Sequence, residues 1–162
     1  MKSLILIRHG DDDENYDDGP LTDRGVMSIL STASQLQSVV TQVNAVLCSP
    51  AKRAKETGQT LCTIYNDAFL EEVPWLLETD DLMARVKTLK NQWSSVCLVS
   101  HQSPIKRFLR KVHPQASNTL DPNKYGSCVV INFERLGFWN RIGDTMAHEP
   151  FTTIYPEGHD LD

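Results

Sequence analysis

The sequence lacks an apolar run long enough to cross a bilayer, which takes about 20 residues; its longest apolar runs have the length of β-strands. The run at the N-terminus, Leu4–Ile7, is also too short for the apolar region of a signal peptide, and no small-residue cleavage site follows it. We therefore expect Leu4–Ile7 to belong to a first strand, and we expect the protein to have no membrane partner.

Closely spaced cysteines are missing as well. The four cysteines form no C-x-x-C pair, which argues against zinc and redox sites. They are Cys48, Cys62, Cys97 and Cys128. Cys48 and Cys97 lie in apolar, strand-like runs, where a free thiol behaves as a small hydrophobic side chain. This usage favours a reducing compartment, and we expect the cytoplasm. We expect no metal ion and no other cofactor.

The sequence has no excess of basic residues. Its formal net charge is −5, whereas a general nucleic-acid binder needs a basic face that displaces counterions from phosphates. We therefore expect no nucleic-acid partner, although this charge is compatible with a local basic pocket. The length of 162 residues is sufficient for a sizeable core, and we expect a single domain over residues 1–162.

What the sequence does contain is an alternation of strand-like and helix-like segments. Short apolar runs predict strands over Ser3–Arg8, Ala45–Cys48, Ala68–Val73, Ser95–Val99 and Cys128–Phe133. Helical spacing predicts four helices. The first runs from a cap at Thr22 or Asp23 to Leu36, and the second covers Ala51–Ile64, with Ser49 as N-cap and Pro50 at the first helical position. The third runs from Asp80 or Asp81 to about Gln92, and the fourth from Pro104 to Val112.

A further strand over Gly137–Ile142 is predicted to pair antiparallel with Cys128–Phe133 around a turn, and the tail from about Glu149 shows no clear periodicity. Alternating strands and helices with nearly continuous apolar strands are typical of a mainly parallel sheet covered on both faces. We therefore predict an α/β fold, a three-layer α/β/α sandwich.

Polar residues that suit phosphate chemistry follow three of the predicted strands. The first strand ends in Arg8, His9 and Gly10, the second delivers Arg53 in the first turn of the next helix, and Ser95–Val99 leads to His101. Ligands of open α/β sheets bind beyond the carboxyl ends of the strands. If the three strands are neighbours, two imidazoles and two guanidiniums meet at one edge of the sheet.

This set is chemically coherent. Guanidinium forks bind phosphate oxygens in pairs, and a neutral imidazole can attack phosphorus and carry the phosphoryl group. Because adjacent cations disfavour protonation of an imidazole, Arg8 and Arg53 would keep His9 in its reactive form. The sequence therefore predicts a phosphoryl-transfer site.

Four ordered motifs carry a family resemblance. Leu6–Gly10 with Asn15 resembles the R-H-G-x-x-x-x-N signature of the histidine phosphatase (phosphoglycerate-mutase-like) superfamily, and Pro20–Gly25 resembles its P-L-T-x-x-G segment. Ser49–Thr57 is similar to S-P-x-x-R-A-x-x-T, and Leu98–His101 is similar to the second-histidine strand of the family. R-H-G alone would be weak evidence, whereas four motifs in family order are specific.

The resemblance implies a role for each matching residue. His9 would be the nucleophile that becomes phosphohistidine, and Arg8, Arg53 and His101 would bind the phosphoryl group. The resemblance also implies four substrate-binding residues. Asn15 and Thr22 would form hydrogen bonds in the pocket, and Gly10 and Gln102 directly follow the two histidines. Gln102 departs from the Gly, Asp or Asn that the family often has at this position.

The short chain resembles the SixA-type phosphohistidine phosphatases most. Only about 48 residues separate Arg53 from His101, which leaves little room for the helical cap that larger members of the family place over the pocket. We therefore expect no large cap subdomain. An open pocket would admit a phosphorylated side chain displayed on another protein.

The general acid is the least determined residue. Larger members carry a Glu in an L-x-E segment, which Leu76–Glu78 matches, and Glu78 is preferred because it falls past the predicted strand end. Glu72, Asp80 and Asp81 stay open as alternatives. An alkoxide leaving group needs a strong proton donor, whereas an imidazole, whose conjugate acid has a pKa of about 6.5, needs far less help. A poorly placed acid therefore favours phosphohistidine over phosphate esters.

The sequence thus predicts a metal-independent phosphatase that acts on phosphohistidine of a protein. Two alternatives stay open: a phosphatase of small phosphate esters or a mutase, and a phosphoprotein-binding module with weak turnover. The acidic loop over residues 11–18 fits a Ca²⁺ loop poorly. It is either an ordinary solvated loop or a ring at the pocket that repels polyanionic substrates.

Overall fold

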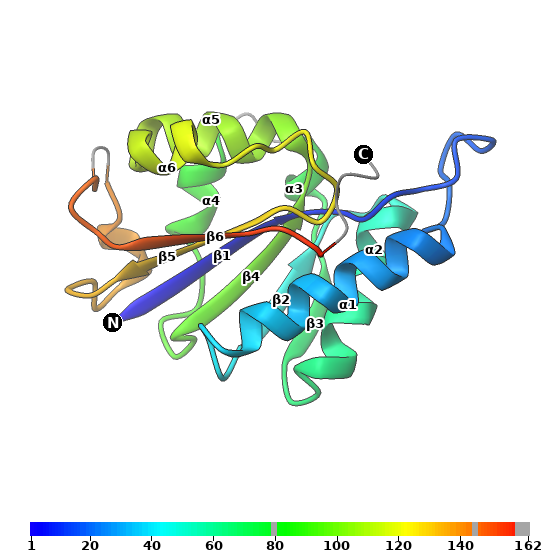
Figure 1. Ribbon diagram of the computed structural model, residues 1–162. Helices are drawn as coiled ribbons and strands as arrows, with labels where there is room; N and C mark the ends of the chain where they lie inside the picture. The colour runs from blue at the N-terminus through cyan, green and yellow to red at the C-terminus, as the bar shows by residue number, and fades with distance from the viewer. Residues whose placement is uncertain (79–80, 144–145, 158–162) are drawn as a thin grey trace.

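The computed structural model describes residues 1–78, 81–143 and 146–157, and its centre is a six-stranded sheet in the order β3-β2-β4-β1-β5-β6 (Figure 1). The strands are β1 (Lys2–Arg8), β2 (Ala45–Cys48), β3 (Phe69–Glu72), β4 (Ser95–Ser100), β5 (Cys128–Phe133) and β6 (Phe151–Ile154). Strands β1 to β4 run parallel, and β5 pairs antiparallel with both β1 and β6. The predicted mainly parallel sheet is confirmed.

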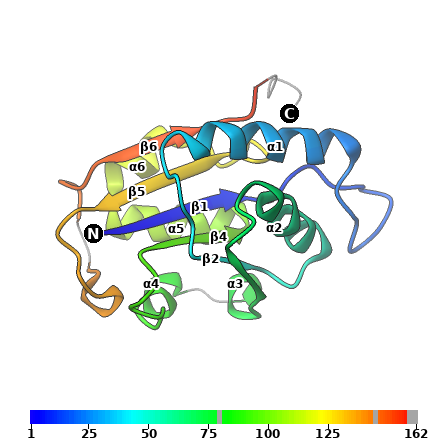
Figure 2. The same ribbon diagram turned by 90° about the horizontal axis from the view of Figure 1, so that it is seen from below.

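Helices cover both faces of this sheet (Figures 1 and 2). One layer holds α1 (Asp23–Gln37) and α2 (Lys52–Ile64), and the other holds α3 (Trp75–Glu78), α4 (Leu82–Val86), α5 (Gln102–Val112) and α6 (Pro114–Thr119). Successive residues of a strand point to opposite faces. Leu6 of β1 accordingly packs in the α5 layer with Ile105, and Ile7 packs in the α1 layer with Ile29. This confirms the three-layer sandwich.

The helix boundaries differ from those predicted at several proline and aspartate positions. The second helix begins at Lys52 with Ala51 as N-cap, so Ser49 and Pro50 precede it. Helix α5 begins two residues before Pro104, because a proline in the first turn removes only an N–H that has no helical partner there. Helix α4 begins after Asp81 as N-cap but ends at Val86, short of Gln92. None of the described helices is long and apolar enough to span a membrane.

The predicted strand over Gly137–Ile142 is wrong. Its central residues, Trp139–Arg141, form a short 3₁₀ helix. The hydrogen bonds of Trp139 explain this: its backbone N–H donates to Oδ1 of Asn91 at 3.0 Å and its indole N–H to the carbonyl of Trp93 at 2.9 Å. The segment is thus bound to the turn before β4. Strand β5 instead lies between two antiparallel partners, β1 and β6, and β6 comes from the tail in which no strand was predicted.

Candidate active site

The three strands that lead to the candidate residues are neighbours in the sheet. β1 pairs in parallel with β4, and Arg8 at its end lies opposite Ser100. β4 in turn pairs with β2. His9 and His101 therefore leave adjacent strands at the same edge of the sheet, and α2 brings Arg53 to this edge in its first turn.

His9 lies at the centre of this group and is 5% exposed. Its Nδ1 lies 2.8 Å from the carbonyl oxygen of Gly10, which can only accept, so Nδ1 carries the proton. Its Nε2 accepts a hydrogen bond from Nε of Arg53 at 3.2 Å. The imidazole is therefore the Nδ1–H tautomer, and the lone pair of Nε2 faces Arg53. This is the form of histidine that can attack phosphorus.

The surroundings of His9 keep it uncharged. Burial is the largest cause that lowers the pKa of His9, and the nearby His101, Arg53 and Arg8 lower it further, while the hydrogen bond to Gly10 opposes them; the result is a pKa of about 3. Desolvation and like charge both disfavour the imidazolium. At neutral pH the Nε2 lone pair is therefore available.

His101 lies beside His9, with the ring centroids 5.1 Å apart. Its Nε2 lies 2.9 Å from Oγ of Ser49, which directly follows β2. Burial first, and then Arg53 and Arg8, lower the pKa of His101 to about 4. As the N-cap residue of α5, His101 also stands next to the free backbone N–H groups of that helix. Neutral donors and guanidiniums thus surround His9.

Arg8 is held by the loop that precedes β5. Its guanidinium stacks over the ring of Tyr125, 4.0 Å from the centroid, and its Nη1 donates to the carbonyl of Asn123. The same loop returns to the site at Gly126, whose φ of 73° favours glycine and whose N–H donates to the carbonyl of His9 at 3.3 Å. Within the described chain the buried Nε of Arg8 has no hydrogen-bond partner, so a bound anion could accept from it.

Helix α2 is tied to the residue after His9 by a buried threonine. The hydroxyl of Thr57 donates to the carbonyl of Arg53 at 2.7 Å and accepts from the N–H of Gly10 at 3.0 Å. One side chain therefore fixes both the turn of α2 that carries the guanidinium and the end of β1 that carries the imidazole.

Comparison with known families agrees with this geometry. Residues 4–80 match the model of the histidine phosphatase superfamily (branch 1), a span that holds His9 and Arg53. The chain belongs to this superfamily. No curated protein sequence matches the chain closely enough to count as a relative.

Solved structures of histidine phosphatases share the fold over nearly the whole chain. A protein described as the phosphohistidine phosphatase SixA of Nakamurella multipartitia is 20% identical, with a TM-score of 0.74 and 96% of each chain covered. The protein histidine phosphatase SixA in complex with tungstate is 21% identical, with a TM-score of 0.71 and 99% of each chain covered. A mycobacterial glucosyl-3-phosphoglycerate phosphatase is 16% identical, with a TM-score of 0.63, and the match covers 82% of this chain and 91% of that one. At these identities the likeness concerns the fold.

Two residues that the superfamily motifs suggest for the pocket make hydrogen bonds within the segment before and at the start of α1. The exposed Asn15 donates from its amide to Oδ1 of Asp13 at 2.9 Å. Thr22 caps α1 by accepting from the N–H of Gly25 at 2.9 Å, and it donates to Oδ2 of Asp11 at 2.8 Å. A Cβ on Gly25 would lie 2.3 Å from the carbonyl oxygen of Asp11. In this structure the segment therefore packs the acidic loop against α1.

Gln102 lies nearer the site than these two. Its side-chain amide donates to Oδ1 of Asn123, the residue whose carbonyl holds Arg8. Gln102 thus connects the start of α5 to the loop before β5, at the margin of the group around His9.

The general acid stays a prediction. Glu78 is the last residue of α3. The structure does not describe the side chain of Glu78, and Asp80 is not among the described residues. Helix α3 itself lies at the end of β4, since the hydroxyl of Ser100 donates to the carbonyl of Leu76 at 3.3 Å. The alternatives are otherwise engaged: exposed Glu72 pairs with Lys55 at 3.5 Å, and Asp81 caps α4 through the N–H of Ala84.

Three residues of the site were not predicted as such. Ser49 was expected only as a helix cap, and its contact with His101 depends on the neighbouring strands. Tyr125 and Asn123 come from a loop without any motif, and only the fold places them against Arg8. Among the described residues, no group of three or more His, Cys, Asp or Glu is arranged to hold a metal ion.

Proposed function

We propose that this histidine phosphatase hydrolyses phosphohistidine on a protein, through a covalent intermediate on His9. The observation that carries the proposal is the uncharged Nε2 of His9, which faces the guanidinium of Arg53 in a group that also holds Arg8 and His101. A neutral nucleophile surrounded by cations and hydrogen-bond donors is what attack on a phosphoryl group requires.

The proposed reaction has two steps. In the first, the substrate phosphoryl group takes the hydrogen bond that Arg53 gives to His9, and Nε2 forms a bond to phosphorus as the bond to the leaving ring breaks. The substrate ring carries a proton on its other nitrogen, so the leaving nitrogen keeps the electron pair and departs in a neutral imidazole. In the second step water attacks phosphorus and passes a proton to a phosphoryl oxygen, the bond between phosphorus and Nε2 breaks so that His9 regains its lone pair, and inorganic phosphate departs. Arg8, Arg53 and His101 bind the phosphoryl oxygens in both steps, where charge is spread over them.

Two observations support a protein substrate over a small ester. Among the described residues the connection between α2 and β4 consists of three short elements, β3, α3 and α4, without a helical cap domain. Two of the similar structures are described as SixA phosphohistidine phosphatases. The relative described as a glucosyl-3-phosphoglycerate phosphatase keeps small esters as the second candidate.

The test is a panel of substrates with two variants. We expect higher kcat/KM on phosphohistidine-containing protein domains than on small phosphate esters, and no turnover of either by His9→Ala. Faster release of phosphate from the esters would overturn the choice of substrate. Stoichiometric binding without release would instead indicate a binding module.

The role of Glu78 is tested by its amide variant. Because an alkoxide needs a proton more than an imidazole does, Glu78→Gln should slow ester hydrolysis by at least about 100-fold, the lower end of what acid catalysis contributes, and phosphohistidine hydrolysis by less. Comparison of kcat for both substrates in the wild type and the variant measures this. Equal losses would remove the leaving-group argument.

A further inference from the structure

Helix α5 carries a concentration of positive charge that the proposed chemistry does not use. Its eleven residues include four cations and no Asp or Glu, in a chain with a net charge of −5. Its apolar stripe faces the core through buried residues such as Ile105 and Phe108, so the cations lie on its outer side. We call Lys106, Arg107, Arg110 and Lys111, together with Lys87 at the end of α4, the α5 basic surface.

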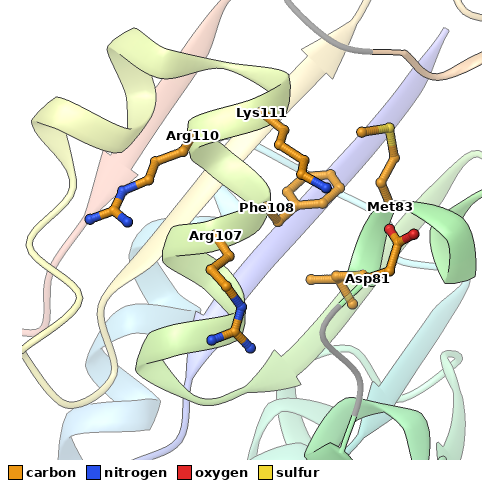
Figure 3. A pocket seen from close by; sticks show the side chains of 7 residues that line it. Asp81, Met83, Arg107, Phe108, Arg110 and Lys111 are labelled. Atoms are coloured by element: carbon orange, nitrogen blue, oxygen red, sulfur yellow. The ribbon is translucent and has the colours of Figure 1, made fainter.

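The α5 basic surface includes a pocket between α4 and α5 of about 280 Å³ (Figure 3). Its apolar lining comes from Leu82, Met83 and Phe108, and its charged lining from Asp81, Arg107, Arg110 and Lys111. One carboxylate against three cations leaves the lining with an excess of positive charge. Figure 3 shows Lys111 and Asp81 on facing sides of the pocket, while Arg110 extends to the other side of α5.

The surface continues on both sides of this pocket. Lys87 and Lys111 line an adjoining depression toward α4, and Lys106 and Arg110 line another toward α6. An anionic side chain that approaches the outer side of α5 between Lys106 and Lys111 therefore meets at least one cation.

The position of α5 connects this surface to the proposed reaction. The helix begins at Gln102, directly after His101, and with a rise of 1.5 Å per residue its cations lie about 6 to 14 Å along the axis from Gln102. The acidic loop lies on the opposite layer, bound to the start of α2 where Oδ1 of Asp18 accepts from the N–H of Lys52 at 2.8 Å. The edge that holds His9 thus has a basic side and an acidic side.

We propose that the α5 basic surface binds an acidic surface of the phosphorylated protein and so orients its phosphohistidine toward His9. This rests on the proposed function. Charge complementarity at a rim raises the rate of association and selects among orientations. A partner with carboxylates beside its phosphohistidine is attracted to α5 and repelled by the loop, so only one orientation satisfies both.

The probe is a pair of peptides that each carry one phosphohistidine. One has four glutamates on one side of it, after a spacer of three residues, and the other has glutamines at those positions. An extended chain spans about 3.3 Å per residue, so the glutamates can reach the cations of α5. We expect kcat/KM about 10-fold higher for the glutamate peptide at low salt, and a ratio near 1 at high salt.

Two sets of variants locate the effect. Arg110→Glu with Lys111→Glu should reduce the peptide ratio to about 1 or below, while phosphohistidine itself is hydrolysed as by the wild type. Arg110→Gln with Lys111→Gln should also reduce it, which guards against a folding defect of the reversal. The matched control reverses two exposed arginines outside α5 and outside the acidic loop, Arg135 after β5 and Arg141 of the 3₁₀ helix, and should leave the ratio unchanged.

Three other outcomes would each point to a different conclusion about the α5 basic surface or the proposed function. A wild-type ratio near 1, or a ratio that the α5 variants keep, overturns the inference while the proposed function stands. If no phosphohistidine is hydrolysed at all, the proposed function fails, and binding of the two peptides to His9→Ala still tests the surface by the same ratio of affinities. Binding to phosphatidylserine vesicles that the α5 variants lose, with a peptide ratio near 1, would assign the surface to an anionic membrane instead.

Discussion

His9 is a buried side chain whose neutral form the fold favours, and this makes protonation of His9 destabilise the folded protein. Its ring is 5% exposed and stands among three other groups that disfavour its protonation, His101, Arg53 and Arg8. Water would stabilise the imidazolium, and the site does not. The same feature that supplies an unprotonated nucleophile therefore makes the folded protein sensitive to acid.

We expect the free energy of unfolding to fall as the pH drops below 6.5. The pKa of His9 is about 3 in the folded chain and about 6.5 in the unfolded chain, so between these values the unfolded state binds the extra proton and is favoured. The stability is complete above pH 6.5 and is lost toward pH 3. Urea unfolding at pH 7.0 and 4.5 should show that His9→Gln loses up to about 3 kcal/mol less than the wild type, since two pH units lie between 6.5 and 4.5 and each is worth about 1.4 kcal/mol.

The other groups that titrate between pH 7.0 and 4.5 are present in both the wild type and His9→Gln. Their effects on the free energy of unfolding therefore cancel when the two proteins are compared. His101, whose pKa is about 4, acts in the same direction and is present in both. An identical loss of stability in the wild type and His9→Gln would contradict the burial of a neutral His9.

At the scale of elements, α2 is attached to β1 through one hydroxyl. Thr57 is fully buried and joins the carbonyl of Arg53 to the N–H of Gly10. Thr60, one turn later, makes the same kind of bond to the carbonyl four residues back, at 2.8 Å to Glu56, but is partly exposed. The helix thus holds a matched pair of threonines, only one of which contacts the site.

Thr57→Val should destabilise the fold by about 1–3 kcal/mol, because it leaves the N–H of Gly10 buried without an acceptor. It should also lower kcat, since Arg53 and His9 lose their shared brace. Thr60→Val should change the free energy of unfolding by no more than about 0.5 kcal/mol. Chemical denaturation and steady-state kinetics measure both effects. Similar losses in the two variants would show that Thr57 acts as an ordinary helix residue.

The sequence predicts strands and site residues best where a short apolar run, which indicates a strand, is followed directly by polar residues that suit the site. Each run that ends in Arg8, Cys48 or Ser100 is apolar and buried, and the polar residues after it follow from the rule that ligands bind at the carboxyl ends of parallel strands. His9 and His101 could therefore be placed together before any coordinates were known.

Prediction failed where distant partners decide the local structure. The segment around Trp139 has the apolar content of a strand, but its N–H groups bond to the turn at Asn91 and Trp93. The cap predicted at Thr22 or Asp23 is found at Thr22, whereas the pocket role of Thr22 stays a prediction. The residues around Tyr125 in the sequence form no motif that indicates a site, because the contact of Tyr125 with Arg8 depends on β5 lying beside β1. Side-chain partners of this kind cannot be derived from periodicity.

At the scale of the whole molecule, two segments of opposite charge lie in the two layers: the basic helix α5 and the acidic loop before α1. Cations line α5 in one layer, whereas the loop before α1 holds exposed acids such as Glu14 and Asp17 and is bound to α2 through Asp18. The loop therefore stands beside the helix that carries Arg53. A substrate with a second phosphate directed to this side would meet repulsion that a monophosphate avoids.

Neutralising the loop should thus relax the choice between phosphate esters. Glu14→Gln with Asp17→Asn should raise kcat/KM for fructose 1,6-bisphosphate by about 3- to 10-fold and for fructose 6-phosphate by less than about 2-fold, because the repulsion scales with substrate charge. The difference should vanish at 1 M salt, where the Debye length is about 3 Å. Glu134→Gln with Asp67→Asn, at exposed positions away from the site, should change neither value. An equal rise for both esters would mean that the loop affects access to the site rather than charge selection, and an unchanged bisphosphate rate would leave these carboxylates as solvated side chains without influence on the substrate.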